Sequence, residues 1–339
     1  MIITRTPFRI SFFGGGTDYP IWYKKNGGAV LSTTINRYSY ITCRFMPPFF
    51  KYKYKLSYSK IEEVNSHKQI DHPAVRETLK FLKLNKNLSI QYDTDLPAKS
   101  GLGSSSTFTV GLLNALYGLK GEMITRRQLA LNAIHIEQKL IGENVGSQDQ
   151  TAAAFGGFNR IEFGGANELT VYPLTIGQSR LSDLHDHLMM FFTGLSRTAS
   201  EIAAEQIRLA PQKSNELNAM KQMVYEAQDI LYSKNKNLDD FGKLLHESWQ
   251  LKRGLSSKIS NSAIDNIYEA GRKAGALGGK LLGAGGGGFI LFFARPEIQP
   301  RIKEKLKKYL HVPFNFENSG SQIIYYSPYD NFDGESRNI

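Results

Sequence analysis

A run of small residues occupies Asp95-Leu96-Pro97-Ala98-Lys99-Ser100-Gly101-Leu102-Gly103-Ser104-Ser105-Ser106-Thr107, here called the serine loop. Residues 88–92 before it alternate apolar and polar side chains, as in a strand, and the apolar residues within 108–116 after it recur with helical spacing. The loop is therefore predicted to be a strand-to-helix turn. Gly101 and Gly103 let a ligand approach the backbone, and the free N–H groups at the start of a helix favour an anion. We interpret this turn as a loop that binds the phosphates of a nucleotide.

Two better-known glycine motifs do not match the serine loop. Walker A ends in Gly-Lys-Ser/Thr, whereas Gly103 is followed by serines and Lys99 lies upstream. The third glycine of the dinucleotide fingerprint would fall on Ser106, and no acidic residue follows at the expected later position. An ordinary helix capped by a serine remains the alternative, because serine is a preferred N-cap.

The composition is that of a globular protein. The chain has 339 residues, which is typical of two domains, and 41% of them are hydrophobic and 22% charged. Cys43 is the single cysteine, so no disulfide framework is possible and a cytoplasmic location is expected. Residues 1–5 do not resemble a signal peptide, and the longest apolar runs, such as residues 289–294, are too short to span a bilayer.

The net charge favours anionic partners. The chain carries 42 lysines and arginines against 31 aspartates and glutamates, a net charge of +11. Residues 49–58 interleave aromatic and basic side chains, as nucleic-acid-binding surfaces do. The same alternation is typical of a half-buried strand with a solvated lysine face. We favour the strand, and predict neither a nucleic-acid nor a membrane partner.

A second glycine-containing segment follows the first predicted strands. Residues 2–13 alternate as a strand pair and end in Gly14-Gly15-Gly16-Thr17-Asp18, here called the glycine bend. It is either a hairpin turn alone or a bend that presents Asp18 and backbone amides to a small polar ligand.

Two carboxylates lie at positions that need an explanation. Glu137 falls on the apolar stripe of a predicted helix that Thr125 opens, and burying it unpaired would be costly. Its partner is either a lysine or arginine, which we favour on this ground alone, or a metal ion. Asp149 precedes a short helical run at residues 150–155, either as its N-cap or as a functional carboxylate beside the same ligand as Glu137.

A third glycine segment lies in the second half of the chain. Gly283-Ala284-Gly285-Gly286-Gly287-Gly288, here called the glycine run, lies between two apolar strands. A hairpin needs only a two-residue turn and glycine weakens strands, so the run indicates close backbone approach to another group. The alternation of predicted helices and strands gives an α+β fold, with a domain boundary near residue 180 in the polar stretch 164–182.

These three segments together resemble the GHMP kinase family of small-molecule kinases. Residues 7–18 resemble the first family motif, residues 97–106 the second and residues 282–290 the third, so that the resemblance covers nearly the whole chain. It implies an N-terminal domain (1–180) similar to the second domain of ribosomal protein S5, a ferredoxin-like C-terminal domain (181–339), and ATP bound between them.

The resemblance also implies roles for individual residues. Ser105 and Glu137 match the family's magnesium ligands, Asp149 its proposed catalytic base, Arg9 the basic residue paired with that base, and Asp18 the sugar-binding acid. Phosphoryl transfer depends mostly on positioning and on neutralising charge, which such a set can supply. The remaining implied contacts are Gly15, Gly16 and Thr17 to the sugar, and Lys99, Ser100, Gly101, Leu102, Gly103, Ser104, Ser105, Ser106, Gly285 and Gly286 to ATP.

One departure within the family bears on the substrate. Galactokinase has Glu-His before its Thr-Asp, whereas this chain has Gly15 and Gly16, so a carboxylate and an imidazole are missing from the sugar pocket. The glycine bend is similar to that of heptose 7-phosphate kinases and of the kinase part of fucokinases, and Thr193-Gly194 followed by Ser196-Arg197 agrees less specifically.

The expected reaction follows from this similarity. It is ATP- and Mg²⁺-dependent phosphorylation of the anomeric hydroxyl of D-glycero-D-manno-heptose 7-phosphate, for GDP-heptose and surface polysaccharide. The alternatives are another sugar 1-kinase, such as a fucokinase, or a catalytically silent sugar sensor.

Overall fold

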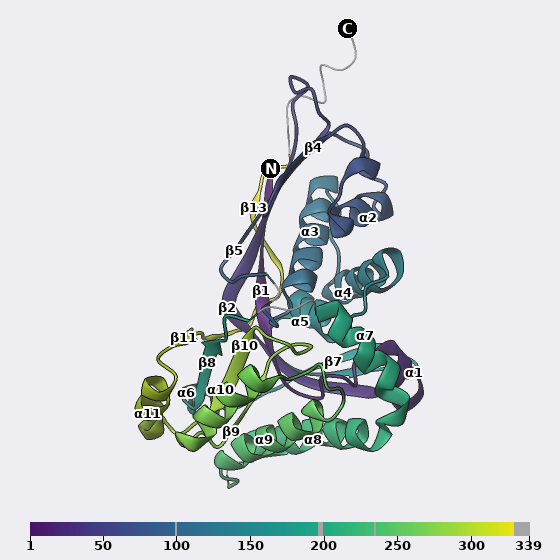
Figure 1. The fold of residues 1–339 in the computed structure, drawn as a ribbon. Helices are drawn as coiled ribbons and strands as arrows, with labels where there is room; N and C mark the ends of the chain where they lie inside the picture. Colours follow the sequence, from purple (N-terminus) through teal and green to yellow (C-terminus); the bar gives the residue numbers. More distant parts are fainter. Residues whose placement is uncertain (99, 196–198, 234, 329–339) are drawn as a thin grey trace.

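The computed structural model describes residues 1–98, 100–195, 199–233 and 235–328. They form two β-sheets with helices packed against each (Figure 1). The first sheet has nine strands, in the order β13-β1-β2-β5-β3-β4, with β12 beside β2 and with β6 between β2 and β7. Its strands are β1 (Ile2–Phe13), β2 (Gly28–Phe45), β3 (Tyr54–Ser57), β4 (Ile61–Val64), β5 (Leu88–Thr94), β6 (Phe158–Phe163), β7 (Leu169–Pro173), β12 (Phe316–Glu317) and β13 (Gln322–Tyr326).

The predicted strand pair at residues 2–13 is wrong, because these residues form the single strand β1. Its antiparallel partner β2 is 18 residues long and accompanies it throughout. The register shifts between Pro7 and Phe8 and again between Ser11 and Phe13. Since proline cannot donate a ladder hydrogen bond, the first irregularity lets the strand continue past Pro7. The predicted strand within residues 49–58 is present as β3.

Helices cover one face of the first sheet, on the right in Figure 1. The longest, α3, begins directly after the serine loop and packs against β1 and β2. It ends at Gly121, whose φ of 71° is left-handed. The helices here are α2 (Pro73–Phe81), α3 (Ser104–Lys120), α4 (Arg126–His135) with a π-helical turn (Ile136–Ile141), and α5 (Gln148–Phe155).

The second sheet is antiparallel, in the order β11-β8-β10-β9. Numbered along the chain its strands therefore run 4-1-3-2, with helices in the connections from β8 to β9 and from β10 to β11. This is the ferredoxin-like pattern that was expected. The strands are β8 (Leu188–Phe192), β9 (Gly278–Leu281), β10 (Phe289–Phe293) and β11 (Leu310–His311).

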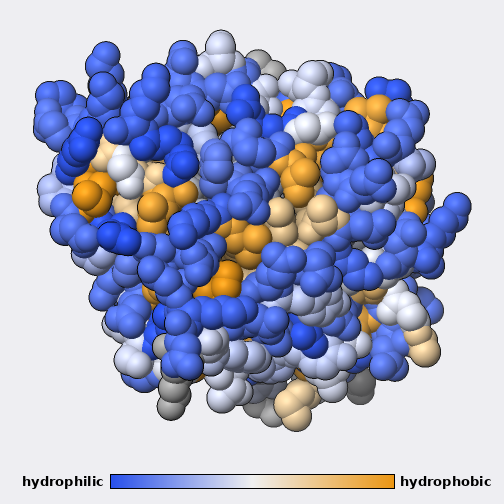
Figure 2. Space-filling view, turned by 90° about the horizontal axis from the view of Figure 1, so that it is seen from below, coloured by the Kyte–Doolittle hydropathy of each residue, from blue (hydrophilic) through white to orange (hydrophobic). Residues whose placement is uncertain are grey.

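The remaining helices belong mostly to the second half of the chain. They are α1 (Pro20–Asn26), α6 (Gln178–Asp186), α7 (Ala199–Leu209), α8 (Ser214–Tyr232), α9 (Asp239–Arg253), α10 (Ser262–Lys273) and α11 (Gln299–Lys305), with 3₁₀ turns at His67–Gln69, Ala210–Gln212 and Pro296–Ile298. The face seen from below in Figure 2 is mostly hydrophilic, with apolar side chains in scattered groups. Among the described helices, none combines the length and the apolar character needed to cross a bilayer.

A shared core joins the two sheets. Phe8 and Phe12 of β1 belong to the same buried cluster as Phe241 of α9 and Phe293 of β10, and the rings of Phe12 and Phe241 meet edge to face at 5.5 Å. Arg9 lies between Phe8 and Phe12 in the sequence. Since protein interiors are close-packed, this core fixes the position of Arg9 relative to the second half of the chain. The strands β12 and β13 return to the first sheet after the second is complete, and the division at residue 180 stays a prediction.

Candidate active site

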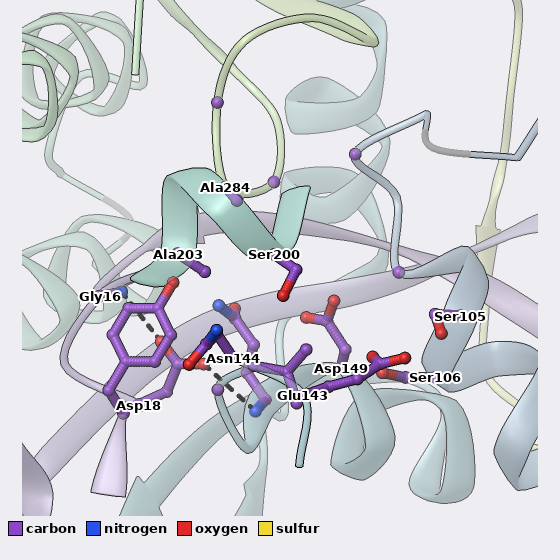
Figure 3. Close-up of a pocket in the computed structure, with 18 of the residues that line it drawn as sticks. Gly16, Asp18, Ser105, Ser106, Glu143, Asn144, Asp149, Ser200, Ala203 and Ala284 are labelled. Carbon is purple, nitrogen blue, oxygen red and sulfur yellow. Dashed lines mark hydrogen bonds between the residues drawn. The ribbon is translucent and has the colours of Figure 1, made fainter. Parts of the chain in front are cut away.

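A pocket of about 980 Å³, its open mouth included, lies where the glycine bend, the serine loop, residues 143–149 and the glycine run meet. Figure 3 shows α7 crossing above it, with Asp18 and Asp149 below and with Ser105 and Ser106 at the start of α3. The three segments singled out in the sequence are therefore brought to one place.

The serine loop leaves the start of α3 open. Gly103 is the N-cap of α3 with a left-handed φ of 83°, and no side chain caps the helix, so the alternative of a serine-capped helix is wrong. A Cβ on Gly101 would lie 2.4 Å from the carbonyl oxygen of Leu282. The serine loop and the glycine run therefore touch through their backbones, and uncapped N–H groups of the first helical turn face a concave site.

Most residues predicted to contact ATP line this pocket, namely Gly101, Gly103, Ser104, Ser105, Ser106 and Gly285. Leu102 and Ser100 do not, because Leu102 belongs to the apolar core and Ser100 is buried. Gly286 uses its N–H to donate to the carbonyl oxygen of Ile259 at 2.9 Å. Lys99 and the Ser196-Arg197 pair lie outside the described residues.

Arg9 and Asp149 form a two-pronged ion pair at the pocket. The Nε and Nη2 atoms of Arg9 donate to the two carboxylate oxygens of Asp149 at 2.9 and 2.8 Å, and its Nη1 donates to the carbonyl oxygen of Gly101 at 2.8 Å. Ser147 is the N-cap of α5 and Asp149 its second residue, so the N-cap interpretation of Asp149 is wrong. The guanidinium of Arg9 therefore orients the carboxylate of Asp149 and also anchors the serine loop through Gly101.

Asp18 is buried at the other side of the pocket. It accepts hydrogen bonds from the backbone N–H groups of Gly16, at 2.9 Å, and Gln148, at 3.4 Å (Figure 3). Burial raises the pKa of its carboxyl group, and the Gly16 hydrogen bond partly opposes this. A Cβ on Gly146 would lie 1.8 Å from the Oδ2 atom of Asp18, so glycine is required beside the carboxylate.

Thr17 and Gly15 are placed differently from Gly16, which lines the pocket. The hydroxyl of Thr17 lies 2.8 Å from the carbonyl oxygen of Gly14 and 2.9 Å from that of Ala29, and it accepts from the N–H of Ala29. Thr17 is thus used to hold the glycine bend, away from the pocket surface. Gly15 adjoins the pocket through Lys252, whose Nζ donates to its carbonyl oxygen at 3.3 Å.

Glu137 is 0% exposed and lies in the π-helical turn after α4. Among the residues that the structure describes, its hydrogen-bond partners are neutral side chains and not a lysine or arginine, so the favoured salt bridge is not found there. Its Oε2 accepts from Ser106 Oγ at 2.8 Å and from the amide of Gln150, and its Oε1 has no partner there. Burial raises its pKa to about 7, although the polar side chains around it oppose the shift.

The donors around Glu137 fit Mg²⁺ better than a metal that needs a full protein cage. The described residues contain no group of three histidine, cysteine, aspartate or glutamate side chains that could hold a metal ion. Mg²⁺ usually takes one or two protein oxygens and completes its shell with phosphates and water. Glu137, with its unpaired Oε1, and the neighbouring Ser106 are oxygen donors of this kind, although Glu137 is buried behind Ser106 and is not among the residues that line the pocket.

Two buried lysines near the pocket were not predicted. Lys252 of α9 is 5% exposed and lines the pocket, and Lys280 of β9 is 4% exposed and donates to the carbonyl oxygen of Phe12 at 2.9 Å. Burial lowers the pKa of Lys252 to about 8, an effect that the charge of Asp18 opposes, and burial also lowers the pKa of Lys280 well below the ordinary lysine value. A signal existed for Lys252, since it continues the buried stripe of Leu245, Ser248 and Trp249 at helical spacing.

Sequence comparisons agree with this geometry. The model of the GHMP kinases N terminal domain matches residues 71–157, and that of the GHMP kinases C terminal domain matches residues 227–312. The chain is 32% identical over 324 residues to D-glycero-alpha-D-manno-heptose 7-phosphate kinase of Campylobacter jejuni, covering 91% of this chain and 93% of that protein. It is 24% identical to the bifunctional fucokinase/GDP-fucose pyrophosphorylase of Arabidopsis thaliana, over 88% of this chain but 31% of that protein.

A solved structure extends the likeness to the fold. The crystal structure of a D-glycero-D-manno-heptose 1-phosphate kinase from Bacteroides thetaiotaomicron superposes with a TM-score of 0.78, over 96% of this chain and 99% of that one, at 24% identity. With both family domains matched, and with a relative of 32% identity aligned over nearly its whole length, this chain belongs to the GHMP kinase family.

Proposed function

We propose that the protein is an ATP-dependent sugar kinase that phosphorylates the anomeric hydroxyl of D-glycero-D-manno-heptose 7-phosphate, giving the 1,7-bisphosphate. The observation that carries the proposal is the Arg9–Asp149 pair, which lies between the uncapped start of α3 and the buried Asp18. The choice of sugar rests on the relative from Campylobacter jejuni, which aligns over 93% of its own length.

In this proposal Asp149 accepts the proton of the attacking hydroxyl. Its carboxylate is partly exposed to the pocket, whereas Arg9 is buried behind it. The two charge-assisted hydrogen bonds from Arg9 fix the direction of the carboxylate. In a loose transition state most bond breaking to the leaving group precedes proton transfer, so orientation matters more than basicity.

The serine loop and the glycine run would hold the ATP phosphates. The backbone N–H groups at the start of α3 and the partial positive charge of that helix end favour a phosphate. Glu137, with Ser105 or Ser106, would hold Mg²⁺, which when bound neutralises charge on the phosphates. Asp18 would bind a sugar hydroxyl at the opposite side of the pocket.

The setting of the reaction is part of the same proposal. The pocket lies between two proposed domains, residues 1–180 and residues 181–339, and the reaction would take place in the cytoplasm. The product would be a precursor of GDP-heptose for surface polysaccharide. The net charge of +11 is compatible with a substrate that already carries a phosphate.

A silent sugar sensor is the less favoured alternative. Sensing a sugar requires neither an oriented carboxylate at the pocket nor a buried carboxylate with an unpaired oxygen, and this chain has both. A fucokinase remains compatible with the relatives, because fucokinase-containing proteins also align with the chain.

ADP release from ATP tests the function directly. Heptose 7-phosphate, free heptose, mannose and fucose would each be offered to the full chain, with Mg²⁺ or with EDTA. We expect turnover with heptose 7-phosphate, lost with EDTA, and much lower kcat/KM for the free sugars, because charge-assisted hydrogen bonds to a phosphate each contribute roughly 1.5–3 kcal/mol. Equal kcat/KM for free and phosphorylated heptose would contradict the substrate, and no sugar-dependent ADP release would contradict the kinase.

A further inference from the structure

The space above the Cα of Gly15 is bordered by polar atoms from three separate elements. A Cβ built on Gly15 would lie 3.6 Å from Gln148 Nε2, 3.6 Å from Lys252 Nζ and 3.7 Å from Ser11 Oγ. Ser11 belongs to β1, Gln148 to α5 and Lys252 to α9. Glycine leaves this space open, and Gln148 and Lys252 also line the main pocket.

The polar groups around this space have unused hydrogen-bonding capacity. Ser11 is 5% exposed, and neither its Oγ nor the Oε1 of Gln148 has a partner among the residues that the structure describes. Buried polar atoms are normally paired, and the exceptions need an explanation. The side-chain amide of Gln148 presents a polar atom to the space in either of its two orientations.

Lys252 adds a cation without a direct ion pair in the described structure. Its Nζ has three N–H donors, and its one recorded acceptor is the carbonyl oxygen of Gly15, at 3.3 Å. A side chain at position 15 would point toward this ammonium group. Because residue 15 is glycine, no carboxylate at that position pairs with Lys252. Lys252 therefore keeps donors for a ligand.

We propose that Lys252, Gln148 and Ser11 form a subsite for one hydroxyl group of the sugar, in the space that glycine at position 15 leaves open. The proposal rests on the proposed function. Lys252 and Gln148 donate to the hydroxyl oxygen, and the hydroxyl donates to Ser11 Oγ. A phosphate fits this place less well than a neutral hydroxyl does, because Asp18 and Asp149 act electrostatically on the same ammonium group and would repel a dianion.

Kinetics of matched variants test the subsite. Gly15→Ala fills the space without backbone strain, because Gly15, unlike Gly14 and Gly16, has no positive φ. Lys252→Met removes the donor, and Lys252→Arg retains the charge. Lys243→Met is the control, since Lys243 lies on the same helix, 61% exposed and paired with Asp240. Thermal unfolding of each variant reports whether it is folded.

We expect Gly15→Ala and Lys252→Met to raise KM for heptose 7-phosphate about 10- to 100-fold, the effect of losing a hydrogen bond to a charged group. KM for ATP should stay unchanged, Lys252→Arg should recover part of the loss, and Lys243→Met should behave as the unaltered protein. Of the 2-, 3- and 4-deoxy analogues of heptose 7-phosphate, one should bind the unaltered protein about 10- to 100-fold more weakly than heptose 7-phosphate does. In Lys252→Met, that analogue and heptose 7-phosphate should bind equally well.

Three results would overturn the subsite. The first is an unchanged KM in both Gly15→Ala and Lys252→Met. The second is a loss confined to the phosphorylated sugar and absent with free heptose, which would assign the space to a phosphate oxygen. The third is equal discrimination against every deoxy analogue by the unaltered protein and Lys252→Met. In all three the unaltered protein still turns over heptose 7-phosphate, so the proposed function would stand.

Discussion

The side of the pocket that we propose for the phosphates is made mainly of backbone, whereas the side that we propose for the sugar is made of buried polar and charged side chains. The phosphate side comprises residues 101–106 and the glycine run, which touch where a Cβ on Gly283 would lie 2.6 Å from the Cα of Gly101. The sugar side comprises the glycine bend with Gln148 and Lys252 from distant helices. Backbone recognition suits a ligand that is always the same, and side chains allow the second ligand to differ between relatives.

Asp149 lies between the two sides, and its removal should have the largest effect. Asp149→Asn keeps the size of the side chain and removes the charge that accepts a proton. We expect ATP and sugar to bind nearly normally while kcat falls roughly 10²–10⁴-fold, the usual range for losing a general base. Steady-state kinetics with heptose 7-phosphate measure it. A retained kcat with lower stability would mean that the Arg9–Asp149 pair only holds α5 against the serine loop.

The Mg²⁺ assignment on the phosphate side should give the next largest effect. Glu137→Gln replaces an anionic ligand by a neutral one of the same shape, so we expect kcat to fall at least about 10- to 100-fold and the Mg²⁺ requirement to rise. Titration of activity with Mg²⁺ measures both. An unchanged Mg²⁺ dependence in folded Glu137→Gln would show that the assignment is wrong.

Two serine variants sharpen this test. Ser106 bonds Glu137, whereas Ser105 is the residue that the family resemblance favours as ligand. We expect Ser105→Ala to raise the Mg²⁺ concentration needed for activity more than Ser106→Ala does, which would mean that Ser105 binds the ion and that Ser106 positions Glu137.

The backbone contact on the phosphate side can be broken with a matched pair of glycine variants. Gly101 and Gly121 both have left-handed φ, 80° and 71°, but a Cβ on Gly121 would meet nothing within 4 Å of it in the described structure. Gly121→Ala should therefore cost only the backbone strain, about 1–2 kcal/mol of unfolding free energy. Gly101→Ala should cost more and should also raise KM for ATP, because the Cβ would push against Leu282. Equal effects of the two variants would mean that this contact does not shape the ATP site.

The smallest expected effect concerns the pH dependence of the sugar side. Burial and the charge of Arg9 lower the pKa of Lys252 to about 8, and the charges of Asp18 and Asp149 oppose this shift. The nearby Lys280 is a second buried lysine with a lowered pKa. Below pH 8 the amine is charged, so KM for the sugar should rise by up to about 10-fold between pH 7 and 9.5 as the ammonium is lost. Lys252→Arg should flatten this profile, since arginine stays charged.

The free energy of unfolding should increase as the pH rises, whereas sugar binding should weaken. Because the pKa of Lys252 is lower in the folded than in the unfolded chain, the unfolded state binds more protons between about pH 8 and the ordinary lysine pKa. The free energy of unfolding should therefore gain a contribution as pH rises through that window, and Lys252→Met should lack it. Urea denaturation at pH 7.5 and 9.5 compares the two proteins.

Local sequence determined the parts of the site that depend on backbone geometry. Glycines 14, 101, 283, 285, 287 and 288 occur where a Cβ would come closer than 3.0 Å to another part of the backbone, and this requirement is visible in the sequence without knowing the partner. Helical spacing of the apolar residues within 108–116 likewise predicted α3, which continues through Gly118 and ends at Gly121. Gly118 lies inside the helix, where a Cβ would lie 2.9 Å from the side chain of Ile323 in β13. Gly118 is therefore required by a contact between α3 and a strand more than 200 residues later in the sequence.

Only the tertiary structure decided which charged groups meet. The sequence favoured a lysine or arginine for Glu137, but packing surrounds it with Ser106 and Gln150 and leaves one oxygen unpaired. The sequence analysis did not predict Lys252 as a site residue, because a lysine on a buried helical stripe can be assigned to a site only when the helix is seen to pack against the glycine bend. Burial and long-range partners depend on how whole elements pack, and a short sequence pattern carries no information about elements far away in the chain.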